Sequence, residues 1–303
     1  MPKIIKIDKQ SLKKVSQGDR RLLSKLLGRV ETMDENEQKE LVSHFLTKKN
    51  RPMIFGITGT PGAGKSTFIS QILKTKDKAE NIGMLLIDPS NPVVGGAILG
   101  DRIRMVDFFL DTSIFIRSIA DKALGDGLGP FLEMYLMLMS CYPFRNIFVE
   151  TVGGGQSNIG ICSLVDKTIL IFDPGSGDSI QHLKSGILDL ADLIIISKAD
   201  LVNCELVKLS LQQSLARETK IICLNLIKQD TKENNLYRKE ILSSKQKLSP
   251  EKIIVSFLSR TILLKFKNNL DVYLKKQVTK NKISDKFIRD ILINIPKYFS
   301  LNS

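Results

Sequence analysis

The sequence predicts an α/β protein built on a doubly wound, mostly parallel sheet. Several strand-length runs are apolar at every position rather than at every second one, as expected for strands covered by helices on both faces. Helical patterns separate most of these runs, and such alternation is typical of parallel sheets. A glycine-rich stretch joins the first run to the first of these helices. The predicted strands are 53–58, 83–87, 113–116, 147–149, 168–172, 193–196 and 220–224, and the predicted helices between them are 65–74, 130–141, 178–190 and 204–218.

A small helical arm is predicted ahead of the sheet, in residues 1–50. Residues 19–30 place leucines on one helical face, and Asp34 is a typical N-cap for a second helix running toward Leu46. Polar residues 48–52 then separate the arm from the first strand. We therefore predict that the sheet domain spans residues 51–228.

Residues 229–303 are predicted to be a helical extension. Pro250 suits the first turn of a long helix, and apolar residues then recur every three or four positions as far as Leu274. This stripe either packs on the sheet domain or forms a seam with a second copy of the chain. A final short helix is expected from Ser284 through Ile293.

Composition narrows the class of protein. In 303 residues no apolar run reaches the length of a membrane span, and the N-terminus lacks the apolar core of a secretory signal. Four scattered cysteines are expected to be reduced, which favours the cytoplasm, or the mitochondrial matrix if a longer precursor was trimmed. With only two histidines, the composition does not favour a metal-storage role.

The net charge of +13 is concentrated near the C-terminus. From residue 241 onward, 13 Lys and Arg face 4 Asp and Glu. Such a tail can bind an acidic partner, a membrane surface or nucleic acid, or it can reflect a lysine-rich composition. No aromatic-studded RNA-binding motif accompanies the lysines, so we do not expect a nucleic-acid partner.

The glycine-rich stretch fits the phosphate-binding loop of nucleoside triphosphatases, G-x-x-x-x-G-K-[ST]. Glycines let backbone N–H groups approach phosphate oxygens, the lysine reaches the β- and γ-phosphates, and the following serine hydroxyl binds Mg²⁺. The alternative is an ordinary turn, but an apolar strand precedes the motif and a helix follows it. The predicted nucleotide-binding residues are Gly59, Thr60, Pro61, Gly62, Ala63, Gly64, Lys65, Ser66 and Thr67.

Acidic residues follow two other predicted strands. Glu150 precedes a glycine-rich segment in a D-x-x-G-like position, and Asp88 and Asp101 flank the segment after the second strand. An acid at a strand end opposite Ser66 can hold Mg²⁺ directly or through water. Each could instead be a solvated loop residue. The predicted metal site is Ser66, Asp88, Asp101 and Glu150.

Ser197, Lys198 and Asp200 end the 193–196 strand, where [NT]-K-x-D selects guanine. The aspartate accepts hydrogen bonds from guanine N1 and N2, and adenine offers no such donor pair. The alternative is a simple strand-to-helix turn. Ser197 stands where Asn is usual, so we expect a weakened guanine preference.

Together these residues resemble the ArgK/MeaB family of P-loop GTPases, chaperones of methylmalonyl-CoA mutase. The resemblance covers roughly residues 18–205 and is carried by GITGTPGAGKST, IDPSNPVVGGAILGDRIRM, FVETVGGGQSN and DPGSGDSIQHLKSGILDLADLIIISKAD. It implies Mg²⁺ and GTP/GDP as cofactors, a homodimer, and a cobalamin-dependent acyl-CoA mutase as partner.

The resemblance also implies roles for individual residues. Lys65, Asp101 and Glu150 belong to the catalytic and switch environment. Lys184 ends an additional switch loop, which spans residues 173–184. Gln156 either positions the attacking water or is a structural amide. Two other functions on the same scaffold stay open, a small-molecule kinase and a nucleotide-sensing module without hydrolysis.

Overall fold

The computed structural model describes residues 5–74, 76–77, 79–89, 108, 110–121, 131–151, 155–175, 186–200, 203–226, 237, 241–242 and 246–279. The chain divides into two compact units, Met1–Ile254 and Val255–Ser303. The first unit holds the sheet and the N-terminal helices, and the second holds most of the long helix α11.

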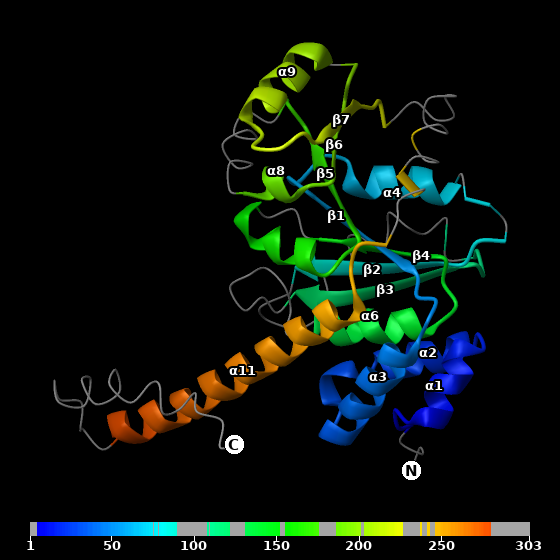
Figure 1. The fold of residues 1–303 in the computed structure, drawn as a ribbon, viewed down its shortest axis with the longest axis vertical. Coiled ribbons are helices and arrows are strands. Elements are labelled where there is room, and N and C mark those ends of the chain that lie inside the picture. Colours follow the sequence, from blue (N-terminus) through cyan, green and yellow to red (C-terminus); the bar gives the residue numbers. More distant parts are fainter. Residues whose placement is uncertain are drawn as a thin grey trace. The chain divides into compact units, whose positions relative to one another are not determined.

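The first unit is built on a seven-stranded sheet in which every neighbouring pair is parallel (Figure 1). The strand order is β3-β2-β4-β1-β5-β6-β7, so β1 lies at the centre and β3 and β7 at the edges. The predicted fold class and all seven predicted strands are confirmed. The strands are β1 (Met53–Gly59), β2 (Ile82–Pro89), β3 (Ile114–Asp121), β4 (Asn146–Glu150), β5 (Lys167–Phe172), β6 (Leu193–Ile196) and β7 (Lys220–Cys223).

β3 extends further than its apolar run predicts. It pairs with β2 residue by residue from Ile114 to Asp121, although Arg117 and Ser118 interrupt the hydrophobic pattern. Within the described residues β2 is its sole strand neighbour. An edge strand tolerates polar residues that a central strand excludes, which is why the prediction ended too early.

Helices cover both faces of the sheet. Ile169 and Ile171 of β5 belong to a core cluster with helix α4 (Lys65–Lys74). The alternate residues Leu170 and Phe172 pack with α8 (Ile187–Leu190) and α9 (Cys204–Ser214). Because successive side chains of a strand point to opposite faces, these two clusters lie on opposite sides, as a doubly wound sheet requires.

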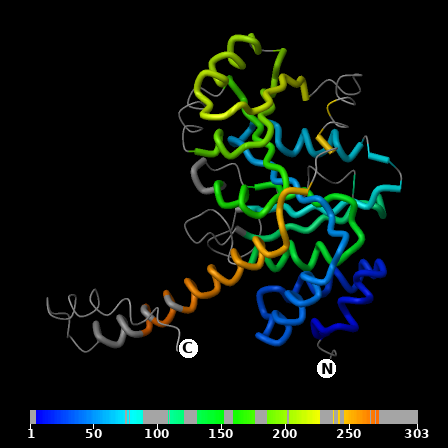
Figure 2. The backbone as a smooth tube through the Cα atoms, viewed as in Figure 1, coloured from blue at the N-terminus to red at the C-terminus, as the bar shows by residue number. Residues whose placement is uncertain are grey.

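The N-terminal arm consists of α1 (Lys9–Ser16), α2 (Arg20–Leu27), the short 3₁₀ turn η1 (Val30–Thr32) and α3 (Glu35–Thr47). The arm packs against α6 (Leu132–Cys141), as the blue and green segments show (Figure 2). Asp34 caps α3 through a capping box with Glu37. A second capping box, between Asp8 and Ser11, begins α1, a helix too short and lysine-rich for its pattern to predict.

Glu37 joins three parts of the arm. Its carboxylate accepts hydrogen bonds from the Ile7 N–H at 2.8 Å and from Arg29 at 2.7 and 3.1 Å, and it also accepts one from the Asp34 N–H. Burial alone raises the pKa of Glu37. The hydrogen bonds from Arg29 and the two backbone groups, with the charge of Arg29, outweigh burial and hold that pKa below its ordinary value of 4.5.

We therefore expect Glu37 to make the stability of the protein depend on acid pH. A carboxyl group with a depressed pKa in the folded state contributes stability that is complete above its unfolded-state pKa and is lost as the pH falls through its folded-state pKa. Glu37→Gln should lower the free energy of unfolding at pH 7 and should flatten its decline below pH 4.5. Urea unfolding at several pH values measures both effects. Glu40→Gln, on the same helix, is the matched control and should lower the free energy of unfolding at pH 7 less than Glu37→Gln does.

A buried ion pair lies at the amino-terminal end of two central strands of the sheet. Arg51, just before β1, donates to both oxygens of Asp166, just before β5, at 2.7 and 2.8 Å. Asp166 also accepts from the N–H groups of Ile54, Lys247 and Leu248 at 2.9, 3.0 and 3.0 Å. One carboxylate thus connects two strands to the segment that leads into α11.

Helix α11 (Pro250–Thr279) begins at Pro250, as predicted. Its part in the second unit exposes several large apolar side chains, namely Val255, Leu258, Ile262, Leu263 and Val272. The helix predicted from Ser284 lies outside the described residues. In the described part of the chain, no helix has the length and hydropathy needed to cross a bilayer.

Candidate nucleotide-binding site

The glycine-rich loop connects the end of the central strand β1 to the start of α4. Gly59 has φ +146°, and a Cβ there would lie 2.0 Å from the carbonyl oxygen of Ile171 on β5. Gly64 has φ +95°, and a Cβ there would lie 2.9 Å from the Leu226 side chain. Both positions therefore require glycine, and the loop presents backbone rather than side chains at the carboxyl end of the sheet.

Lys65, the first residue of α4, lies folded over the loop. Its Nζ donates to the carbonyl oxygens of Gly59 and Thr60, each at 3.0 Å, and the residue is 8% exposed. The ammonium is thus held above the loop. A phosphate bound on the loop would pair with this ammonium group, and the already buried side chain would not have to be buried further.

Ser66 lies in direct contact with Glu150. The Ser66 hydroxyl donates to Glu150 Oε1 at 2.8 Å, although the two residues are 84 positions apart in the sequence. The strand register explains the contact, since Glu150 pairs with Ile57 of β1 and ends β4 beside the loop. The Thr151 N–H donates to the Ile57 carbonyl at 3.0 Å and keeps the two strand ends together.

Asp88 lies near the end of the next strand. Leu86 of β2 pairs with Glu150, so Asp88 follows two residues further along the neighbouring strand. Its side chain is buried, with the residue 1% exposed. The parallel sheet therefore brings two acidic residues to the carboxyl-terminal ends of its strands, where the phosphate loop also lies.

The oxygen atoms of this site suit Mg²⁺. The described residues contain no group of three His, Cys, Asp or Glu able to enclose a metal by themselves. Mg²⁺ is normally bound by one or two protein oxygens together with waters and substrate phosphates. The Ser66 hydroxyl and the Glu150 carboxylate meet that requirement, and Asp88 follows two residues further along the neighbouring strand.

The segment after β6 is fastened to β5. The Ser197 hydroxyl is buried and donates to the Phe172 carbonyl at 3.1 Å. Lys198 has φ +53°, unusual for a residue other than glycine, and its Nζ pairs with Asp173 Oδ2. Asp200 is exposed two residues later. The turn therefore has a fixed geometry that leaves the Asp200 carboxylate accessible.

The contacts of two residues near this site were not predicted from the sequence. Asp173 begins the predicted switch loop, but its pairing with Lys198 was not expected. Leu226 lies in the segment after the last strand, where the resemblance would place a guanine-loop element, but its contact with the phosphate loop was not expected. Its side chain faces Gly64, and its carbonyl accepts from Gln71 of α4, so the segment after β7 packs against the phosphate loop.

Three predicted site residues have no described side-chain position. Asp101 and Lys184 lie outside the described residues. Gln156 belongs to the 3₁₀ helix η3 (Gly155–Ser163), whose backbone is described at that position. Their roles stay predictions.

The fold and parts of the sequence are shared with known proteins. A crystal structure of an LAO/AO transport system kinase superposes with a TM-score of 0.63 at 20% identity, covering 95% of this chain and 97% of that one, which shows a common fold. GTPase ArgK of Escherichia coli (strain K12) is 33% identical over 195 residues, 63% of this chain and 59% of that protein. The mitochondrial methylmalonic aciduria type A homolog of Mus musculus is 33% identical over 184 residues, 60% of this chain and 43% of that protein.

These alignments and a family model agree. The chain spans about three fifths of the length of the first curated relatives it matches. The family model described as methylmalonyl Co-A mutase-associated GTPase MeaB matches residues 23–249, which include the arm from Leu23 onward, the sheet and every residue of the site above. The chain belongs to the MeaB family of P-loop GTPases, as its motifs predict.

Proposed function

We propose that this protein binds GTP with Mg²⁺ and hydrolyses it slowly. The observation that carries the proposal is the 2.8 Å contact between the Ser66 hydroxyl and Glu150. It joins a hydroxyl at the end of the phosphate loop to a carboxylate at the end of a strand. A Mg²⁺–nucleotide complex needs both of these oxygen ligands close to the phosphates. Relatives named as GTPases and the family match support the same reaction.

Each group of the site has a defined task in this proposal. The loop N–H groups and Lys65 bind the phosphates and fix the γ-phosphoryl group for in-line attack by water. Ser66 and Glu150, with Asp88, hold the cation. Bound Mg²⁺ supplies positive charge that offsets the charge developing on the phosphate oxygens.

Guanine is the base that the segment after β6 suits. Asp200 is exposed and able to accept from guanine N1 and N2. The Lys198 ammonium pairs with Asp173, which fixes the turn that carries Asp200. The Ser197 hydroxyl is engaged with Phe172, so it is not the base contact that Asn usually supplies. We therefore expect a guanine preference that depends mainly on Asp200.

The partner proposed for this GTPase is a cobalamin-dependent acyl-CoA mutase. The family description and the mouse relative's name support a link to methylmalonyl-CoA metabolism. We further propose a homodimer in which the exposed apolar side chains of α11 meet those of a second copy. The four cysteines are free thiols, which suits the proposed cytoplasmic or mitochondrial-matrix location.

Glu150→Gln tests whether this carboxylate holds the cation. The amide keeps the shape but removes the charge that holds the cation, so phosphate release from GTP should fall roughly 10- to 100-fold and should need more Mg²⁺ for half-maximal rate. Single-turnover phosphate release across a Mg²⁺ series measures both. Glu37→Gln removes a buried carboxylate from the arm and should leave the rate and the Mg²⁺ requirement unchanged.

The same assay separates the alternatives. Transfer of the γ-phosphoryl group to a metabolite instead of water would identify a kinase. Phosphate release at the uncatalysed rate, with and without the mutase, would identify a nucleotide sensor without hydrolysis. An unchanged Mg²⁺ requirement in Glu150→Gln would mean that Glu150 does not hold the cation.

A further inference from the structure

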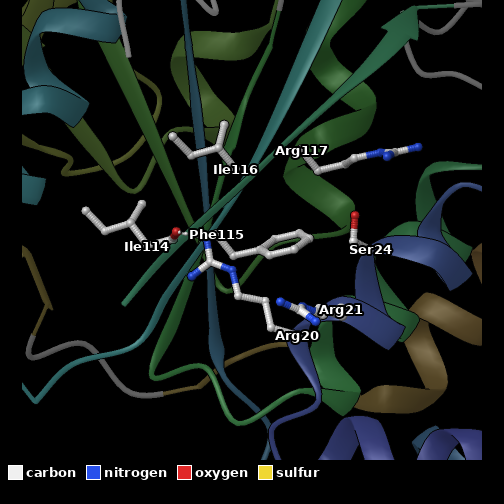
Figure 3. A pocket seen from close by; sticks show the side chains of 7 residues that line it. All are labelled: Arg20, Arg21, Ser24, Ile114, Phe115, Ile116 and Arg117. Carbon is white, nitrogen blue, oxygen red and sulfur yellow. Dashed lines mark hydrogen bonds between the residues drawn. The ribbon is translucent and has the colours of Figure 1, made fainter. Parts of the chain in front are cut away.

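A second cationic site lies away from the phosphate loop, between α2 and the edge strand β3. A cavity of about 570 Å³ is lined by Arg20, Arg21 and Ser24 of α2 and by Ile114, Phe115, Ile116 and Arg117 of β3 (Figure 3). All strands are parallel, and these β3 residues form its amino-terminal half. The cavity is therefore remote from the strand ends that carry the nucleotide site.

Arg20, Arg21 and Arg117 all line this cavity. Within the described residues no Asp or Glu forms an ion pair with any of them. Asp19, the nearest acid in sequence, caps α2 through the Leu22 N–H and does not line the cavity. Three like charges around one space repel each other, and a bound anion relieves that repulsion.

Each arginine is held differently. Arg20 donates to the carbonyls of Thr112 and Ile114, and its guanidinium lies 5.4 Å from the centre of the Phe115 ring. Arg117 interacts with Tyr135, and its buried Nε has no acceptor within the described residues. Arg21 is exposed and makes no hydrogen bond to a described residue. Arg20 is thus fixed by the protein, whereas Arg21 and Arg117 keep donors for a ligand.

The contacts of Arg20 also decide between two kinds of ligand. A peptide that adds a strand to β3 needs the outward-facing carbonyls of that strand. Arg20 already occupies one of them, at Ile114, the first residue of β3, and it also occupies the carbonyl of Thr112 just before the strand. Strand addition is disfavoured at this end of β3, where the cavity lies, and an anionic ligand is the better fit.

We propose that this cavity binds a small organic molecule through its phosphoryl group. Guanidinium groups pair with phosphate oxygens in bidentate geometry, and Arg21, Ser24 and Arg117 line the cavity together with Phe115 (Figure 3). A volume of about 570 Å³ exceeds that of a single phosphate and is typical of small-molecule sites. Phe115 and Ile116 supply an apolar surface for the rest of the ligand.

Phenyl phosphate is a suitable probe, because it carries one phosphoryl group and one ring. Its binding is measured by calorimetry on the Lys65→Ala protein, in which the phosphate loop is disabled, so the result does not depend on the proposed GTPase function. We expect one site per chain. Arg21→Ala in that background should weaken binding about tenfold or more, and Arg117→Lys should weaken it as well.

The matched control is Lys25→Ala, which removes the same charge from an exposed position of α2 outside the cavity. It should change the affinity less than about twofold. The proposal is overturned if Lys65→Ala protein does not bind the probe, or if Lys25→Ala weakens binding as much as Arg21→Ala. Equal affinity for benzoate would show a site for carboxylates and would also overturn it.

Discussion

Lys65→Ala should lower the affinity for GDP and GTP by about a hundredfold or more. The ammonium already lies over the loop, 3.0 Å from two of its carbonyl oxygens, so it is in place to pair with a phosphate. Hydrogen bonds to charged groups are worth about 1.5–3 kcal/mol each, and the lysine of this motif would pair with the β- and γ-phosphates together. Calorimetric titration with GDP in the presence of Mg²⁺ measures the loss.

Lys74→Ala is the control for that variant. It removes the same charge from the exposed last turn of the same helix, and the affinity for GDP should change little. Equal affinities for wild type and Lys65→Ala would mean that the phosphates do not lie on this loop.

Asp166→Ala should cause a large loss of stability, about 3–5 kcal/mol. The Asp166 side chain is fully buried and that of Arg51 is 4% exposed. Removing the carboxylate leaves the guanidinium buried without its counter-charge, and the N–H groups of Ile54, Lys247 and Leu248 lose their acceptor. The free energy of unfolding in urea measures the cost.

Two further variants test the cause of that loss. Lys247→Ala removes the exposed ion pair with Asp192 and should cost at most about 1 kcal/mol. Replacing both members, Arg51→Met with Asp166→Leu, removes the buried charges together and should recover much of the stability lost in Asp166→Ala. A single variant Asp166→Ala that unfolds like wild type would contradict this account of the network.

The fold could be predicted from sequence because its signals are local. Strands buried on both faces are apolar at every position, and Asp34 and Pro250 mark helix starts by their own chemistry. The same signals failed at β3 and α1. Arg117 and Ser118 interrupt the apolar run of β3, which an edge strand tolerates, and α1 has few apolar residues among its lysines.

The site was predictable only in part, because only some of its signals are local in the sequence. The phosphate loop is a contiguous motif, and Glu150 is marked by its place at a strand end. The contact of Ser66 with Glu150 depends on the strand order, as does that of Lys198 with Asp173. Arg51 and Asp166 are 115 residues apart, and neither shows in sequence that it is buried.

A titration of GDP and ADP side by side, each with and without Mg²⁺, tests the central claim most directly. If guanine is read by Asp200 and the cation lies between Ser66 and Glu150, GDP should bind more tightly than ADP, and Mg²⁺ should strengthen GDP binding. Equal affinities for GDP and ADP, together with no effect of Mg²⁺, would contradict both assignments.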